Sequence, residues 1–358
     1  MDWPRIFNTK GFTPLIPALA PLAFLYGVAV RLRIMGRKTI FKSKSLPGSV
    51  ISIGNLCVGG TGKTPATCML AEWALREGYR VVVLSRGYAG KHQKKILEVS
   101  NGKEIHAGPV EAGDEPYLIA KRLPGVPVIV SKKRYLAGLH ALHRFRANLF
   151  ILDDGFQHLT LKRNLDMVLI DAADPFGNGR LLPWGPLREP LAQLERANVV
   201  IMTRSSHSPS KDDLSLILKK RFPGIAFFKA DHIPERIVFP GQGRHHDLDF
   251  LKGKRIMAFA GIARPELFQK TLIQLGAEIK GFKKFKDHFM FNKDIFRKMV
   301  IEKDRMGADY MITTEKDWVK LEQVAEGYPY LAYLTIRFDI LDEKDRFLQL
   351  IKRTIEGK

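Results

Sequence analysis

The sequence predicts an α/β protein whose main domain is a parallel sheet flanked by helices. Three observations lead to this prediction. Short apolar runs rich in β-branched residues recur along the chain, which is typical of buried parallel strands. Helical patterns follow most of these runs, as expected for an alternating β and α order. Glycine-rich or charged segments come directly after several runs, at the sheet edge where ligands bind in such folds.

The first apolar run, Val50 to Ile53, leads into a glycine-rich turn and then a helical pattern through Ala66 to Arg76. Strand, glycine turn, Lys-Thr and helix follow in the order of a P-loop, in which backbone N–H groups and a helix N-terminus converge on phosphate. Lys63 would reach the β- and γ-phosphates, and the Thr64 hydroxyl would hold Mg²⁺. The residues predicted to cradle the nucleotide are Gly59, Gly60, Thr61, Gly62, Lys63, Thr64 and Pro65.

One position departs from the strict P-loop spacing. That spacing asks for glycine five residues before Gly62, where this chain has Cys57. Gly59 and Gly60 supply the flexibility instead. A tight turn with a surface lysine is the alternative interpretation, and the flanking strand and helix argue against it.

Length and composition limit the class of protein. The chain has 358 residues, which suits one very large domain or two ordinary ones. Lys and Arg total 58 against 37 Asp and Glu, so the formal net charge of +21 favours anionic partners, with simple solubility as the alternative. The two cysteines, Cys57 and Cys68, form neither a disulfide framework nor a zinc motif, which indicates a reducing cytosolic setting.

The N-terminal segment, residues 1–38, is predicted to attach the protein to a membrane. Residues 12–30 are almost entirely apolar, and basic residues follow directly. Prolines crowd the first half of this run and would interrupt a helix there. We therefore predict an apolar helix from about Ala20 to Arg37 that dips into one bilayer face, with its basic end at anionic headgroups. A core helix and a true membrane span are the alternatives.

The next predicted strands end in polar residues that we expect near the ligand. Arg86 follows the strand from Tyr79 to Leu84 and is either an anion contact or an exposed loop residue. Arg134 follows the strand at 126–130. Asp114 opens a helix to about Arg122, where it is either an N-cap or a catalytic carboxylate.

The run Leu149 to Leu152 ends in Asp153 and Asp154, the pattern of a Walker B strand. Asp153 would orient Mg²⁺ and its waters opposite Thr64, and Asp154 lies beside it at the strand end. A turn after a core strand is the alternative. Further on, the Gly/Pro-rich loop at 177–190 contains Arg188, which could clamp a phosphate.

Beyond residue 226 strands and helices alternate again, which predicts a second, smaller α/β unit. Two extended stretches, 226–238 and 328–338, flank this region. An amphipathic helix at 342–355 closes the chain.

These motifs together resemble the tetraacyldisaccharide 4′-kinase family of lipid A biosynthesis. The P-loop alone would be weak support, but its combination with Asp-Asp-Gly-Phe-Gln and Gly-Pro-Leu-Arg-Glu-Pro is far more specific. The matching stretches occur in the same order along the chain, at 54–65, 85–88, 113–116, 153–158, 179–190, 261–265, 287–288 and 313–317.

The resemblance implies ATP- and Mg²⁺-dependent phosphorylation of the 4′-hydroxyl of a tetraacyldisaccharide 1-phosphate, giving lipid IVA, at the cytoplasmic face of the bacterial inner membrane. Its implied partners are this anionic lipid disaccharide and the anionic membrane surface, with no nucleic acid and no protein partner. It also implies an Asp114–His288 dyad on the acceptor hydroxyl, and leaves open which of the two accepts the proton. Lys63 and Asp154 complete the expected catalytic set, and the expected substrate contacts are Arg86, Glu115, Arg134 and Arg188.

The family resemblance further implies two α/β/α units joined by a two-stranded linker. We therefore divide the chain into a membrane-associated segment at 1–38, a P-loop kinase core at 39–225, a second α/β domain with the linker at 226–340, and a C-terminal helix at 341–358 that returns to the core. Because the dyad residues come from different units, catalysis would require the units to close on the nucleotide.

Two other classes of protein share some of these features. A membrane-associated P-loop ATPase switch of the partition type also reads Gly-Gly-x-Gly-Lys-Thr, but it carries a lysine where this chain has Val58. A non-catalytic basic protein that binds lipid or nucleic acid would leave the P-loop and the strand-end carboxylates unexplained.

Overall fold

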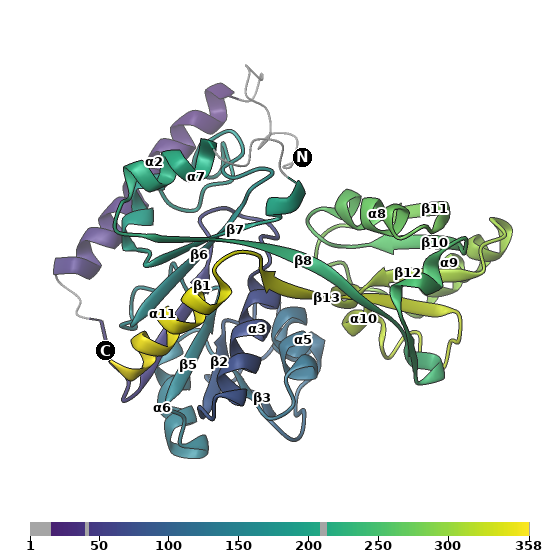
Figure 1. Cartoon of the computed structure of the whole chain (residues 1–358), viewed down its shortest axis with the longest axis horizontal. Helices are drawn as coiled ribbons and strands as arrows, with labels where there is room; N and C mark the ends of the chain where they lie inside the picture. The colour runs from purple at the N-terminus through teal and green to yellow at the C-terminus, as the bar shows by residue number, and fades with distance from the viewer. Residues whose placement is uncertain (1–15, 40–42, 208–212, 358) are drawn as a thin grey trace.

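The computed structural model describes residues 16–39, 43–207 and 213–357, which form two α/β lobes joined by two long strands (Figure 1). One continuous sheet runs through both lobes in the strand order β11-β10-β12-β13-β8-β7-β6-β1-β5-β2-β4-β3. We call the lobe built on β1 to β7 the first unit and the lobe built on β10 to β12 the second unit. The predicted α/β class with two sheet-based units is confirmed.

The first unit contains a sheet that is parallel except at its edge strand β3. Its strands are β1 (Ser49–Gly54), β2 (Val81–Ser85), β3 (Leu97–Asn101), β4 (Pro127–Val130), β5 (Leu149–Asp153), β6 (Leu165–Asp171) and β7 (Val199–Thr203). Its helices are α3 (Lys63–Arg76), α4 (Pro109–Ala112), α5 (Asp114–Arg122), α6 (Arg134–Phe145) and α7 (Asp213–Arg221). β1 pairs with β5 so that Ile53 lies opposite Asp153. The P-loop and the strand-end carboxylates therefore leave the sheet side by side.

The second unit has a smaller parallel sheet of β10 (Arg255–Ala260), β11 (Glu278–Lys284) and β12 (Tyr310–Thr314). Its helices are α8 (Pro265–Gln274), α9 (Lys293–Arg305) and α10 (Glu315–Leu321). Apolar side chains from these elements form two separate buried clusters, one on each face of the sheet. This packing gives the second unit a core of its own.

Two long antiparallel strands, β8 (Ala226–Phe239) and β13 (Leu331–Ile340), connect the units (Figure 1). The first residues of β8 pair with β7, and most of the rest pair with β13, so this strand carries the continuous sheet from the first unit into the second. α11 (Lys344–Glu356) follows β13 and packs Phe347 and Ile351 into the core of the first unit. Because β8 and β13 are shared, the domain boundaries drawn at 225 and 340 stay predictions.

The N-terminal helix α2 spans Ile16–Thr39, which is longer than the predicted helix from about Ala20. Pro17 falls in the first turn, where the missing N–H has no intrahelical acceptor anyway, and Pro21 is tolerated inside the helix. Leu19, Ala23, Val30 and Ile34 form a buried stripe along α2. The part of the apolar run before residue 16 lies outside the described residues.

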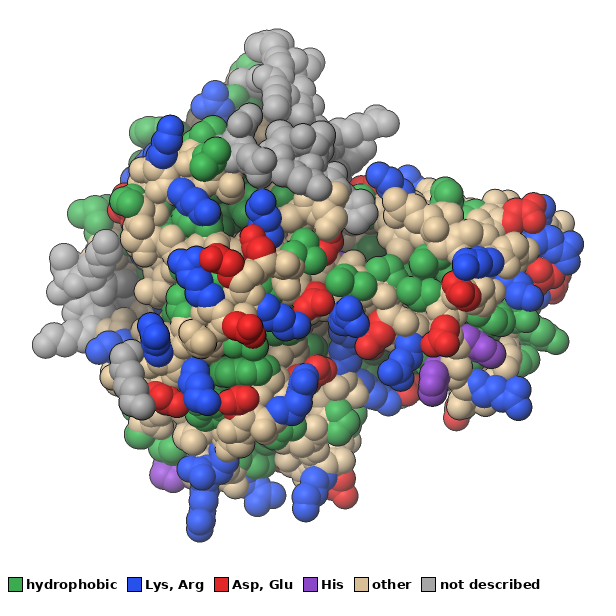
Figure 2. Space-filling model, viewed as in Figure 1, with side chains coloured by type: hydrophobic (Ala, Val, Ile, Leu, Met, Phe, Trp, Pro, Cys, Tyr) green, Lys and Arg blue, Asp and Glu red, His purple; other side chains and the backbone are tan. Residues whose placement is uncertain are grey.

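The opposite side of α2 exposes large apolar residues, namely Leu22, Phe24, Leu25, Val28, Leu32 and Met35. Within the described part of the chain, Pro17–Gly36 is the one helix long and apolar enough to cross a bilayer by length and composition. Lys and Arg side chains are spread over the face drawn in Figure 2 and alternate there with Asp and Glu, so the positive charge is not gathered into one stripe on that face.

Several elements were not predicted from the sequence, among them β3, α7 and β11. β11 lies at the edge of its sheet, where lysines are common because they discourage pairing with another chain. Because of these lysines the stretch lacks the apolar pattern of a buried strand, and its strand conformation is instead specified by pairing with β10.

Candidate active site

The P-loop connects β1 to α3 through glycines in backbone conformations that other residues rarely adopt. Gly59 has φ 116° and Gly62, the N-cap of α3, has φ 88°. A Cβ atom at Gly62 would lie 2.0 Å from Nε2 of His232 on β8, so glycine is required there for space as well. Asn55 donates a hydrogen bond of 3.1 Å to the Thr61 hydroxyl and braces the loop from inside.

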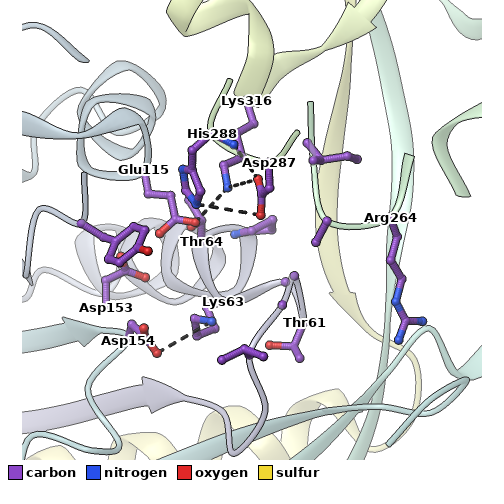
Figure 3. Close-up of a pocket in the computed structure, with 18 of the residues that line it drawn as sticks. Thr61, Lys63, Thr64, Glu115, Asp153, Asp154, Arg264, Asp287, His288 and Lys316 are labelled. Carbon is purple, nitrogen blue, oxygen red and sulfur yellow. Dashed lines mark hydrogen bonds and ion pairs between the residues drawn. The ribbon is translucent and has the colours of Figure 1, made fainter. Parts of the chain in front are cut away.

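Lys63 begins α3 and lies beside Asp154, with 3.7 Å between Nζ and Oδ1 (Figure 3). Arg188 donates from one guanidinium nitrogen to both oxygens of Asp154, at 2.9 and 3.0 Å. Burial acts to raise the pKa of Asp154, but Lys63 and Arg188 outweigh it and lower the pKa to about 2. Asp154 is thus a permanently charged group that holds two cations at the phosphate loop.

Asp153 has a different environment, although it precedes Asp154 directly. Its carboxylate accepts hydrogen bonds of 3.3 Å from the hydroxyls of Thr67 and Ser85, and it has no ion-pair partner among the described residues. Burial, with the negative charges of Glu115 and Asp154, raises its pKa to about 7. A cation bound here would therefore relieve an uncompensated buried carboxylate.

The Asp114–His288 pair joins the two units. Nδ1 of His288 lies 2.9 and 3.0 Å from the carboxylate oxygens of Asp114. Gly113, not Asp114, is the N-cap of α5, and its φ of 92° turns Asp114 toward the second unit. The hydrogen bond that His288 donates to Asp114 raises the pKa of His288. His288 lines the cavity, whereas Asp114 is buried behind it.

Lys316, the second residue of α10, is a site residue to which the sequence analysis gave no role. Its ammonium lies 3.1 Å from Glu115, 3.3 Å from Asp287 and 4.0 Å from Asp114 (Figure 3). It therefore bridges carboxylates of both units beside the dyad. The positive charge of Lys316 opposes the effect of Asp114 on the pKa of His288.

These groups surround one cavity of about 1480 Å³ between the two units. Every predicted site residue except Asp114 lines it. The second unit contributes Ile262, Ala263 and Arg264 as well as His288 and Lys316. Of the predicted substrate contacts, Arg134 is buried with its Nε unpartnered in the described structure, and burial lowers its pKa to about 10. Arg134 and Arg86 thus bring positive charge to the cavity beside the strand-end carboxylates.

Ion pairs hold the units together on both sides of the cavity. On one side, Arg264 of the second unit pairs with Asp171 at 2.8 Å and with Asp174 at 3.0 Å. On the other side, Lys121 of α5 pairs with Glu322 at 2.7 Å, and Arg122 pairs with Glu315. The structure therefore represents an arrangement in which the second unit covers the P-loop.

A P-loop lysine, a strand-end pair of aspartates and an Asp–His pair facing the phosphate loop define a P-loop phosphotransferase. The comparisons with known proteins specify it further. The profile of the tetraacyldisaccharide-1-P 4′-kinase family matches residues 15–356, and the chain belongs to this family. It is a kinase, as the sequence-based resemblance predicted.

Relatives named tetraacyldisaccharide 4′-kinase match nearly the whole chain. The protein from Syntrophus aciditrophicus (strain SB) is 40% identical over 347 residues, covering 94% of this chain and 92% of the relative. The protein from Geobacter metallireducens is 38% identical over 331 residues, with coverages of 92% and 96%. The solved structure of Aquifex aeolicus LpxK, described as a complex with ATP, is 35% identical to this chain and has a TM-score of 0.76. The match covers 95% of this chain and 99% of the Aquifex chain.

Proposed function

We propose that this chain transfers the γ-phosphate of ATP to the 4′-hydroxyl of a tetraacyldisaccharide 1-phosphate at a membrane surface. The observation that carries the proposal is the convergence of two sets of groups in one cavity. Lys63, Asp153 and Asp154 face it from the first unit, and His288 with Lys316 faces it from the second. The ATP of the Aquifex relative and the names of the other relatives favour this donor and this lipid acceptor.

Mg²⁺ fits the residues present. The Thr64 hydroxyl in the first turn of α3 and the Asp153 carboxylate at the end of β5 are hard oxygen ligands that both line the cavity. The described residues contain no cluster of three or more His, Cys, Asp or Glu that could hold a metal ion. This agrees with Mg²⁺, which is usually held by one or two carboxylates together with substrate phosphates and waters. When bound, Mg²⁺ would neutralise charge on the transferred phosphoryl group.

The protein groups have separate tasks in this proposal. The P-loop amides and Lys63 bind the phosphates and balance their negative charge. Arg188 and Lys63 keep Asp154 ionised and fixed in place. His288, oriented by Asp114, faces the acceptor hydroxyl and removes its proton, which is expected to contribute about 10²- to 10⁴-fold to the rate.

The attachment to a membrane is proposed from α2. Its buried stripe, from Leu19 to Ile34, packs against the first unit along most of the helix, while the other side exposes apolar residues. A helix that spanned the bilayer would have to leave this packing. We infer that α2 lies in the interface of one leaflet, because it combines one packed face with one exposed apolar face.

The function is tested by incubating γ-labelled ATP with the protein, with and without the tetraacyldisaccharide 1-phosphate, and separating the products by thin-layer chromatography. Label that moves to the lipid supports the kinase. Release of inorganic phosphate without any labelled lipid would instead support an ATPase switch and contradict the proposal.

Replacement of Asp153 by alanine is expected to raise the Mg²⁺ concentration required for half-maximal activity by about tenfold or more, because the variant removes the proposed carboxylate ligand. The measurement is a Mg²⁺ titration of label transfer at saturating ATP. Asp166→Ala is a suitable control, since Asp166 is a buried carboxylate that pairs with Arg163 away from the cavity. An unchanged titration in the Asp153 variant would mean that another group holds the ion.

Replacement of Lys316 by methionine is expected to move the acidic limb of the pH–rate profile to higher pH. Lys316 lowers the pKa of His288, so the imidazole of the variant stays protonated, and inactive as a base, to a higher pH. Lys316→Arg should restore the limb. Lys293→Met, which removes an exposed lysine from the start of α9, is the matched control. A limb that stays in place in the methionine variant would show that Lys316 does not act on the dyad.

A further inference from the structure

The helix α2 contacts the loop that carries Arg188, in addition to packing on the first unit. The Tyr26 hydroxyl donates a hydrogen bond of 2.8 Å to the backbone carbonyl of Arg188. Seven residues further along the same helix, Arg33 donates to the carboxylate of Glu189 at 3.0 Å. Both Tyr26 and Arg33 also line the cavity. The membrane-facing helix is thus joined to the active site at two successive loop residues.

The two loop residues are themselves tied to the catalytic centre. The Arg188 side chain holds both oxygens of Asp154, and its backbone N–H donates at 2.7 Å to the carbonyl of Leu56, just before the P-loop glycines. Glu189 is fully buried and has two arginine partners, Arg33 at 3.0 Å and Arg196 at 2.5 Å. A buried carboxylate with two charged donors restrains the backbone around it, although the Arg33 side chain itself is 51% exposed.

The helix also approaches this loop closely at Gly27. A Cβ atom there would come within 2.9 Å of Cδ1 of Leu181, which belongs to the same loop. The hydrogen bond, the ion pair and this close contact lie along one side of α2. A shift of the helix relative to the first unit would therefore displace the loop and, through Arg188, the carboxylate of Asp154.

We propose that Tyr26 and Arg33 are positioning residues for the phosphoryl transfer. Through them, the position of α2 on the first unit determines where Arg188 and Asp154 lie at the phosphate loop. This inference rests on the proposed function. According to this inference α2 affects the rate of the reaction, whereas from the sequence the N-terminal segment was expected to serve membrane attachment. Small displacements of positioning groups are known to cost enzymes up to about 10²-fold in rate.

The test compares Tyr26→Phe, Arg33→Gln and Arg31→Gln in the full chain. Tyr26→Phe removes the hydroxyl and keeps the aromatic ring. Arg31 is exposed and has no ion-pair partner in the described structure, so Arg31→Gln removes the same charge from the same helix and leaves the bonds of Tyr26 and Arg33 to the loop in place. Cosedimentation with vesicles of phosphatidylcholine and phosphatidylglycerol should be equal for the two arginine variants, because each has lost one positive charge.

The expected result is a kcat about 5- to 50-fold below wild type for Tyr26→Phe and Arg33→Gln, with the KM for ATP unchanged, and a kcat near wild type for Arg31→Gln. Arg33→Lys should recover part of the loss. In an Arg188→Ala background, Tyr26→Phe should have little further effect, since the group that it positions is gone. An unchanged kcat in Tyr26→Phe, losses that add fully to that of Arg188→Ala, or equal losses in the two arginine variants would overturn the inference.

A second measurement does not depend on activity. Amide hydrogen exchange of peptides covering 181–189 should be faster in Tyr26→Phe than in wild type, because the amide of Arg188 is held in the same network. Exchange that matches wild type would contradict the positioning role. Failure of the wild-type chain to label the lipid would contradict the proposed function, while this comparison would still decide the role of Tyr26.

Discussion

Replacement of Lys63 by alanine is expected to lower kcat by about 10³-fold while leaving the fold intact. The Lys63 side chain is only 11% exposed, and its ammonium lies 3.7 Å from Oδ1 of Asp154 at the P-loop. The variant loses the charge that balances the β- and γ-phosphates. It also removes one of the cations that keep the pKa of Asp154 low. The measurement is label transfer to the lipid at saturating Mg-ATP.

Two controls separate this loss from misfolding. Lys94→Ala removes an exposed lysine from a loop outside the cavity and should keep the wild-type rate. Circular dichroism and the thermal midpoint of Lys63→Ala should match those of wild type, because α3 begins at this position and alanine is a good helix former. A folded Lys63 variant with a wild-type rate would remove Lys63 from the catalytic set.

The first unit could be predicted from the sequence because its signals are local. A buried apolar run followed by glycines and Lys-Thr specifies its own strand, turn and helix. The rule that parallel strands deliver their carboxyl ends to one edge then places Asp153 beside the P-loop, and the register of β1 and β5 agrees. The conformations of Gly59 and Gly62 follow from the same pattern.

Contacts between distant segments could not be predicted in this way. Lys316 lies beside Asp114 because the paired strands β8 and β13 place α10 of the second unit next to α5 of the first. The sequence around residue 316 contains no pattern that predicts this contact. Tyr26 and Arg188 are 162 residues apart in the sequence, yet the Tyr26 hydroxyl donates to the Arg188 carbonyl. The local pattern at Asp114 fits a cap and a catalytic carboxylate equally well; its pairing with His288 was expected only from the family resemblance, and the structure places the two side chains in hydrogen-bond contact.

The second large effect is expected at the dyad. Asp114→Ala and His288→Ala should each lower kcat by about 10²- to 10⁴-fold, because a sugar hydroxyl needs a positioned base. The double variant should be little worse than either single variant, since groups that act as a unit give losses that do not add. The KM for ATP should change little, because neither residue belongs to the P-loop.

His288 requires a second variant because its backbone has a φ of 59°, in the left-handed region. Asparagine tolerates that conformation better than alanine, so His288→Asn removes the imidazole with less backbone strain. Equal losses in the asparagine and alanine variants would assign the effect to the imidazole. A near wild-type rate in His288→Asn would assign the alanine effect to the backbone and would exclude His288 from proton transfer.

The pH–rate profile provides the remaining test of the dyad. His288 donates to Asp114 and faces Lys316 and Asp287, and the bond to Asp114 raises its pKa. A neutral imidazole is required of a base, so activity should fall as the pH drops through this raised pKa. In Asp114→Asn the negative charge is lost and the pKa of His288 returns toward its ordinary value, so the acidic limb of the residual activity should move to lower pH. In His288→Asn that limb should disappear. Fully additive losses together with an unmoved limb would show that Asp114 and His288 act independently of each other.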